Sequence, residues 1–233
     1  MAKEVGICIN GVIRDYLTAL DKKYRQVFDM EPNYPYNIEN LDETFPIEEI
    51  DRGDSLSFDL NFEADFQWDE NLQDYVPQNK PETLKSNDQS QREEQRSIYY
   101  FMYFESPLPI FARAPYTEKF VINTIGELER NIQDRITLVS KESQMTKNAT
   151  LMFLCADSQF DNDNIKFVNS VEEYWEPFDI LITENPVILN KKPSNKTAIK
   201  YITSYNKNSP ADFEINSVSD LFENPTKYFS VND

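Results

Sequence analysis

The chain has 233 residues and a net charge of −18, from 41 acidic and 23 basic side chains, and it contains no histidine. The lack of histidine excludes Ser-His and Cys-His catalysis and removes the commonest zinc ligand. The negative charge argues against nucleic acid and membrane surfaces as direct partners, and no apolar run is long enough to span a membrane.

The N-terminal segment predicts a strand, a turn and a helix. Val5 to Ile9 is a short apolar run, which is typical of a buried strand. From Asp15 to Phe28, apolar residues recur at helical spacing, which predicts an amphipathic helix. This order is typical of the opening of an α/β domain.

Residues 31–74 hold fourteen acids and one base, so this stretch carries −13 of the net charge. Residues 55–62 alternate polar and apolar side chains, which predicts a half-buried strand, and the polar residues 75–97 predict an exposed loop. The aromatic run 98–104 favours a buried strand, with a partner-binding surface as the alternative. The aromatic side chains that we consider for partner binding are Phe62, Phe66, Trp68, Tyr99, Tyr100 and Tyr103.

The second half returns to alternating elements. A capping box at Thr124 predicts a helix that continues through Ile136 and Val139, and Thr150–Cys155 is a continuous apolar run typical of a parallel strand. We predict further strands at 165–168, 178–183 and 197–203, and short helices at 170–175 and 217–223. The fold class expected is α/β, a mainly parallel sheet with helices on both faces. Residues 1–30 and 116–233 form its core, and 31–115 form a large acidic, β-containing insertion after the first helix.

Three segments resemble the haloacid dehalogenase (HAD) superfamily of phosphatases and related enzymes. Residues 8–15 read Cys-Ile-Asn-Gly-Val-Ile-Arg-Asp, where the family's first motif has Asp-x-Asp-Gly. Residues 151–158 resemble the second motif, with Cys155 in the place of its hydroxyl residue. Residues 179–186 resemble the strand that delivers metal-binding acids, with Glu184-Asn185 where a pair of acids is common. The resemblance implies a HAD/Rossmann-like sheet with a cap-like insertion.

The chemistry that this resemblance implies is damaged at three positions. The family uses the first Asp as nucleophile, the second as acid/base, and Mg²⁺ between carboxylates and phosphate. Cys8 is a poor magnesium ligand, Asn10 cannot shuttle a proton, and Glu184 alone would hold a metal only weakly. The family's lysine has two candidates, Lys147 and Lys166. We therefore expect a degenerate HAD-like domain with no catalytic residues, metal or cofactor.

The two cysteines, Cys8 and Cys155, lie in apolar runs, so we expect buried free thiols in a reducing compartment. A nucleophilic Cys8 is not expected, because no phosphate-binding loop with an arginine follows it at the required spacing.

Three functions remain open. The first is a non-catalytic structural or assembly protein that binds other protein subunits, as a homo-oligomer or in a larger assembly. Abundant Asn and Lys with few Gly suggest a bacteriophage virion component, for example a head-tail ring, and we expect a cytoplasmic or virion location. The second is a Mg²⁺-dependent phosphatase or nucleotidase whose turnover Glu184→Gln abolishes. The third is an acidic regulatory protein that binds a basic protein through residues 31–74.

Overall fold

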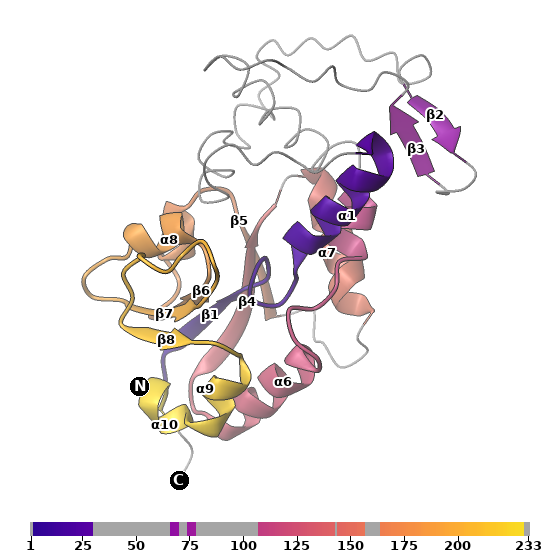
Figure 1. The fold of residues 1–233 in the computed structure, drawn as a ribbon. Helices are drawn as coiled ribbons and strands as arrows, with labels where there is room; N and C mark the ends of the chain where they lie inside the picture. The colour runs from indigo at the N-terminus through magenta and orange to yellow at the C-terminus, as the bar shows by residue number, and fades with distance from the viewer. Residues whose placement is uncertain are drawn as a thin grey trace.

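A six-stranded sheet forms the centre of the protein. The computed structural model describes residues 2–29, 66–69, 74–77, 107–142, 144–156 and 164–230. In space the strands follow the order β5-β4-β1-β6-β7-β8, and each neighbouring pair is parallel (Figure 1). Their bounds are β1 Glu4–Cys8, β4 Arg135–Lys141, β5 Ile165–Val168, β6 Ile180–Thr183, β7 Thr197–Tyr201 and β8 Phe213–Ile215.

Helices cover the sheet on both faces. In Figure 1, α1, α6 and α7 lie on one side of the central strands and α8 on the other. The helices of the described residues are α1 Tyr16–Phe28, α6 Val121–Asn131, α7 Gln144–Cys155, α8 Pro186–Asn190, α9 Ser219–Glu223 and α10 Pro225–Tyr228, with short helical turns η3 Leu108–Ala112 and η5 Glu172–Tyr174. The predicted α/β class with a parallel sheet is thus confirmed.

The core lies around β1 and β6, whose side chains are almost completely excluded from solvent. A strand covered on both faces can be apolar throughout, which explains the continuous apolar runs at these positions. Gly6 is required for close packing here, because a Cβ at this position would lie 2.6 Å from a ring carbon of Phe178.

The apolar run ending at Cys155 is a helix, so the strand predicted for 150–155 is wrong. Buried side chains in this segment recur at helical intervals, at Thr146, Ala149, Thr150 and Phe153, while Met152 is 58% exposed. The sequence prediction missed this helical spacing, because it considered only the apolar run from Thr150 and left out the buried positions one turn earlier.

The predicted helix from Thr124 to Val139 is too long and starts too late. Helix α6 begins after Phe120, and Thr124 lies inside it, with its hydroxyl donating to the Phe120 carbonyl. The backbone becomes extended at Ile132, and residues 135–141 form β4. Apolar residues spaced four apart continued across this boundary by chance, and this made a helix and a strand look like one helix.

Six other predicted elements are confirmed within one to three residues, namely β1, α1, β5, β6, β7 and α9. The predicted helix at 170–175 is a 3₁₀ turn, and α8, β8 and α10 had not been predicted. Of the insertion, β2 (Phe66–Asp69) and β3 (Asp74–Pro77) are described and pair antiparallel. The strands predicted at 55–62 and 98–104 lie outside the described residues, and the domain boundaries stay predictions. Within the described ranges, no helix has the length and apolar character needed to cross a membrane.

Candidate functional site

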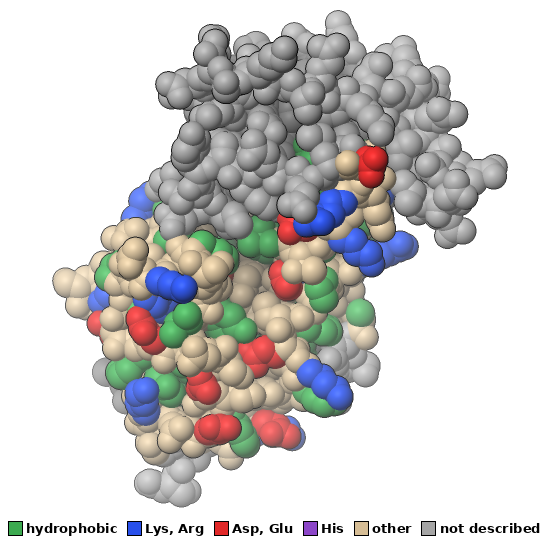
Figure 2. All heavy atoms as spheres, viewed as in Figure 1, with side chains coloured by type: hydrophobic (Ala, Val, Ile, Leu, Met, Phe, Trp, Pro, Cys, Tyr) green, Lys and Arg blue, Asp and Glu red, His purple; other side chains and the backbone are tan. Residues whose placement is uncertain are grey.

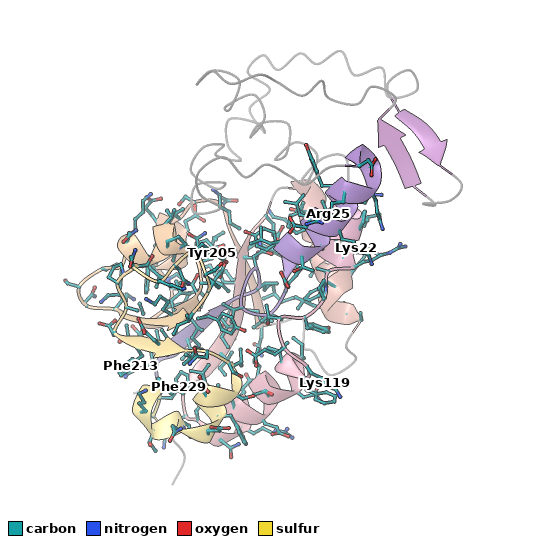
Figure 3. The ribbon with its side chains drawn as sticks, viewed as in Figure 1. Lys22, Arg25, Lys119, Tyr205, Phe213 and Phe229 are labelled. Carbon is teal, nitrogen blue, oxygen red and sulfur yellow. The ribbon has the colours of Figure 1, made fainter. Side chains whose placement is uncertain are left out.

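The strand order reverses between β1 and β6, and this topology predicts a crevice at the carboxyl ends of the two strands. From β1 the chain passes to β4 and β5 on one side of it, then returns to β6, β7 and β8 on the other side. Such a reversal leaves the loops after the two central strands diverging, and ligands of open parallel sheets bind at this point. Asn10 and Gly11 follow β1, and Glu184 follows β6. Tyr205, labelled in Figure 3, follows β7 at this same end of the sheet.

A buried arginine holds the loop after β1. Arg14 is fully buried, and its guanidinium donates to the side chains of Asn10, Thr150 and Glu142 and to the carbonyl of Phe111. The guanidinium also lies 4.8 Å from the centre of the Phe111 ring. Because every direction of the guanidinium is occupied, the Asn10 loop is fixed to α7 and η3.

Glu142 neutralises this arginine. Its Oε1 lies 2.7 Å from Arg14 Nη2 and also accepts from the hydroxyls of Ser140 (2.7 Å) and Thr150 (2.8 Å), and the side chains of the ion pair are fully buried. Oε2 is buried and accepts no hydrogen bond from any described residue. A buried ion pair is tolerated when further hydrogen bonds satisfy it, as Ser140 and Thr150 do for Oε1.

Glu184 is packed directly against the loop after β1. A Cβ added at Gly11 would lie 2.0 Å from the Glu184 carboxyl carbon, and Gly11 has φ of +76°. Both facts require glycine at this position. The Glu184 carbonyl accepts 2.7 Å from the buried Asn206 Nδ2, which also donates to the Tyr201 carbonyl. The end of β6 is therefore fixed to the end of β7, and the Glu184 carboxylate is fixed against the β1 loop.

The structure places the residues predicted for the family's first and third motifs in different surroundings. Cys8 is buried at the end of β1, and the parallel register places it on the sheet face shared with Val139. Asn10 precedes Gly11 in the loop after β1, and the Glu184 side chain lies against Gly11. Asn185 caps α8, and its side-chain oxygen accepts from the amides of Val187 and Ile188. Its place in the third motif stays a prediction.

The segment that resembles the second motif is a helix and not a strand. Cys155 is exposed at the end of helix α7, so it is neither a buried thiol nor the end of a strand. Ser140 fits the description of that motif, because it lies near the end of β4, beside β1, and accepts from Asn10 Nδ2. The alternation of apolar residues over 135–141 was the signal that could have identified it.

Sequence reasoning also missed Arg14, Glu142 and Asn206 as parts of the site. A charged residue inside the apolar tail of the first motif was the available signal for Arg14, because such a residue is buried only with partners. The proposed family lysines do not reach the crevice by any contact in the described residues. Lys147 lies 5.8 Å from the Phe167 ring centre, and Lys166 is exposed on β5.

Tyr201 extends the polar network beside the crevice. Desolvation, followed by the charge of Glu118, raises the pKa of the Tyr201 hydroxyl to about 12. Glu118 in turn accepts from the Ser217 hydroxyl (2.6 Å) and the Val218 amide (2.7 Å) ahead of α9. Tyr201 is thus a neutral hydrogen-bonding group at neutral pH.

Figure 2 shows acidic and basic side chains interspersed over the visible face of the described residues. Lys22 and Arg25 are exposed on α1 (Figure 3). Of the aromatic partner-binding candidates, Phe62, Tyr99, Tyr100 and Tyr103 lie outside the described residues, and Phe66 and Trp68 are described only as backbone of β2. The predicted partners, oligomeric state and virion location stay predictions.

The described donor set does not fit the magnesium site that the resemblance implies. Oδ1 of Asn10 already accepts from two nitrogens of Arg14, Glu142 is neutralised by the same arginine, and Cys8 offers a soft sulfur. No group of three or more acidic, histidine or cysteine side chains in the described ranges could hold a metal ion. Glu184 by itself is too few carboxylates for a strong Mg²⁺ site.

Comparison with known proteins identifies the fold. No family model and no curated protein matches the sequence. Among solved structures, a dehalogenase with an intermediate complex matches with a TM-score of 0.51 at 10% identity, covering 100% of this chain and 98% of that one. A hydrolase from Pseudomonas syringae matches with a TM-score of 0.51 at 11% identity, covering 98% and 100%. These matches show a HAD-like fold.

The same matches correct one prediction. We predicted from the two missing aspartates that the chain is not an enzyme, and this prediction is contradicted by the matches to a dehalogenase and a hydrolase over nearly the whole chain. Its physical basis was also too narrow. The missing acids were judged one position at a time, whereas Arg14, Ser140 and Glu142 rebuild a charged, hydrogen-bonded network around Asn10.

Proposed function

We propose that this protein is a hydrolase that cleaves a small phosphate monoester at the carboxyl ends of β1 and β6, without a bound metal ion. The observation that carries the proposal is the contact of the Glu184 carboxylate with the loop after β1, at the point where the strand order reverses. This is the crevice in which open parallel sheets bind ligands. The match to a hydrolase of the same fold supports the reaction class.

Glu184 has the role of general base in this proposal. It is 4% exposed, and its backbone is fixed by Asn206, so the carboxylate has little freedom to move. It takes a proton from water while the water oxygen bonds to phosphorus. The P–O bond to the alcohol breaks, and the proton passes from Glu184 to the leaving oxygen. Inorganic phosphate and the free alcohol are the products.

The test is turnover of a phosphomonoester panel by the wild type, Glu184→Gln and Glu176→Gln. Glu176 is an exposed residue that gives a matched control. Acid/base catalysis contributes about 10²–10⁴-fold, so Glu184→Gln lowers kcat by this order while Glu176→Gln leaves it unchanged. Turnover that is equal in all three proteins, or absent from the wild type, contradicts the proposal.

Two further arms of the assay define the chemistry. Cys8→Ala is expected to keep turnover, because water is the nucleophile in this proposal. Loss of turnover in Cys8→Ala alone would make the thiol the nucleophile. A chloro-substituted carboxylic acid belongs in the panel because one matched structure is a dehalogenase. If only that compound were turned over, the proposal that the substrate is a phosphate monoester would be wrong.

A further inference from the structure

We infer that Asn10 is a hydrogen-bond donor for an anionic oxygen of the substrate, and that Arg14 is the positioning residue that orients it. This inference rests on the proposed hydrolase function and assigns Asn10 a role of its own at the same site. In the resemblance to the family's first motif, Asn10 stands where an aspartate acts as the acid/base. Its contacts show instead which end of the amide faces Arg14 and which end faces Ser140.

The orientation of the Asn10 amide follows from its partners. Arg14 has only donors, so the Asn10 atom that receives Nε (3.0 Å) and Nη2 must be the oxygen. The nitrogen Nδ2 then points to the Ser140 hydroxyl oxygen at 3.2 Å. An asparagine side chain is often ambiguous between two flips, but here a buried arginine removes the ambiguity.

The proton of Ser140 sets the direction of the rest of the network. An ionised carboxylate only accepts, so Ser140 donates its proton to Glu142 Oε1 at 2.7 Å. Its oxygen is then an acceptor for Asn10 Nδ2. Hydrogen bonds therefore run from Asn10 through Ser140 to Glu142.

One N–H of Asn10 remains for a ligand. Nδ2 carries two protons, and in the described part of the chain its contact is Ser140. Asn10 is half-buried, in contrast with the fully buried Arg14. The five N–H groups of Arg14 are matched by its contacts to Asn10, Phe111, Thr150 and Glu142. Arg14 therefore has no donor to offer a substrate, and its effect on the substrate passes through Asn10.

This arrangement suits a phosphate oxygen. Preorganised donors aimed at developing negative charge are an effective source of transition-state stabilisation. An aspartate at position 10 would still accept from Arg14, but it could not donate to Ser140 or to a phosphate oxygen. The substitution that restores the family's motif thus removes the function that we infer.

The test is calorimetric binding of inorganic phosphate to the wild type, Asn10→Asp, Asn10→Ala and Asn190→Asp. Asn190 is exposed at the end of α8 and controls for the added charge. We expect phosphate affinity to fall at least about tenfold in both Asn10 variants, because a charge-assisted hydrogen bond is lost. Asn190→Asp should bind as the wild type does. Melting temperatures of all four proteins check that each is folded.

Two results would overturn the inference while leaving the hydrolase proposal intact. One is unchanged phosphate affinity in Asn10→Asp and Asn10→Ala beside a wild type that binds and turns over. The other is Mg²⁺-dependent turnover in Asn10→Asp above that of the wild type, which would make position 10 an acid site. A wild type that neither binds phosphate nor hydrolyses the panel overturns both.

Arg14→Lys tests the positioning role. Lysine keeps the positive charge but cannot hold two atoms of one amide in a fixed fork. In ¹⁵N-labelled protein we expect the Asn10 side-chain resonances to lose their phosphate-induced shift while the backbone spectrum stays dispersed. A shift equal to that of the wild type would make Arg14 purely structural.

Discussion

The two flanks of β1 at its carboxyl end are built in opposite ways. On the β4 flank, Arg14, Asn10 and Glu142 bond side chain to side chain in a closed, charge-neutral network. On the β6 flank, Glu184 is held through its backbone carbonyl by Asn206, and its carboxylate lies against Gly11. The β4 flank therefore fixes the Asn10 amide that we infer to bind the substrate, whereas the β6 flank presents a carboxylate. Substitutions on each flank, and on surfaces outside them, test whether the two flanks differ in this way.

The largest effect is expected on the β4 flank. Arg14→Met leaves Glu142 as a buried charge without its ion-pair partner, and this should lower the free energy of unfolding by about 3–5 kcal/mol. Urea denaturation of the purified protein measures it. Arg14→Met/Glu142→Leu should cost less than the sum of the single changes, because the double variant leaves no unpaired charge. Additive costs would mean that the two residues do not act as a unit.

On the β6 flank, Gly11→Ala should lower the free energy of unfolding less than Arg14→Met does, but it should reduce turnover strongly. A non-glycine residue in the left-handed region costs about 1–2 kcal/mol, and the added Cβ displaces the Glu184 carboxyl group. A misplaced catalytic group can cost about 10²-fold in rate. Unfolding and kcat are measured together. If kcat persists, the carboxylate at this contact is not the general base.

Gly126→Ala is the matched control for that change. Gly126 lies inside α6 with nothing within 4 Å of an added Cβ. Alanine there should stabilise the protein by about 0.5–1 kcal/mol, because alanine favours a helix interior. Equal losses at both glycines would show that Gly11 has no special role.

A pH effect is expected at Tyr201, beside the crevice. Its pKa is raised to about 12 by desolvation and by Glu118, so the folded state favours the protonated hydroxyl. This contribution is fully present below pH 10 and is lost as the pH rises from about 10 to 12. Unfolding of the wild type and Tyr201→Phe at pH 9 and pH 11.5 should show a smaller loss in the variant. Parallel losses would show that Tyr201 does not titrate in this range.

The smallest effect on stability is expected for an exposed ion pair outside the two flanks of β1. Lys191 Nζ lies 3.2 Å from Glu172 Oε1, with side chains 42% and 66% exposed. A backbone hydrogen bond, then Lys191, lowers the pKa of Glu172. Exposed pairs contribute about 0–1 kcal/mol, so Lys191→Met should change stability little. A loss comparable to that of Arg14→Met would remove the distinction between buried and exposed pairs.

The sequence predicted those parts of the fold where burial produces a local pattern. Strands β1 and β6 are mostly apolar and were predicted, and α1 has one apolar face. The error at 150–155 arose because exposed positions of α7 such as Met152 are apolar too, so only the spacing of the buried residues distinguishes this helix from a strand. Helix α8 spans five residues, too few to show a period.

The site was less predictable because its contacts join distant segments. Asn10 and Glu184 were identified from the motif, but the partners of Asn10 lie 130 residues away at Ser140 and four residues away at Arg14. Hydrogen bonds of this kind depend on strand order, which the sequence does not state. Judging each motif position alone led to the wrong prediction that the chain is not an enzyme.

The most direct test of the account is titration of ¹⁵N-labelled protein with inorganic phosphate, followed through the side-chain amide resonances. Asn10→Asp assigns the Asn10 pair by its disappearance. We expect saturable shifts of the Asn10 Nδ2 protons and of the Gly11 amide, because the anion binds between the two flanks. Shifts that leave Asn10 and Gly11 unmoved would contradict a phosphate-binding site at the carboxyl ends of β1 and β6.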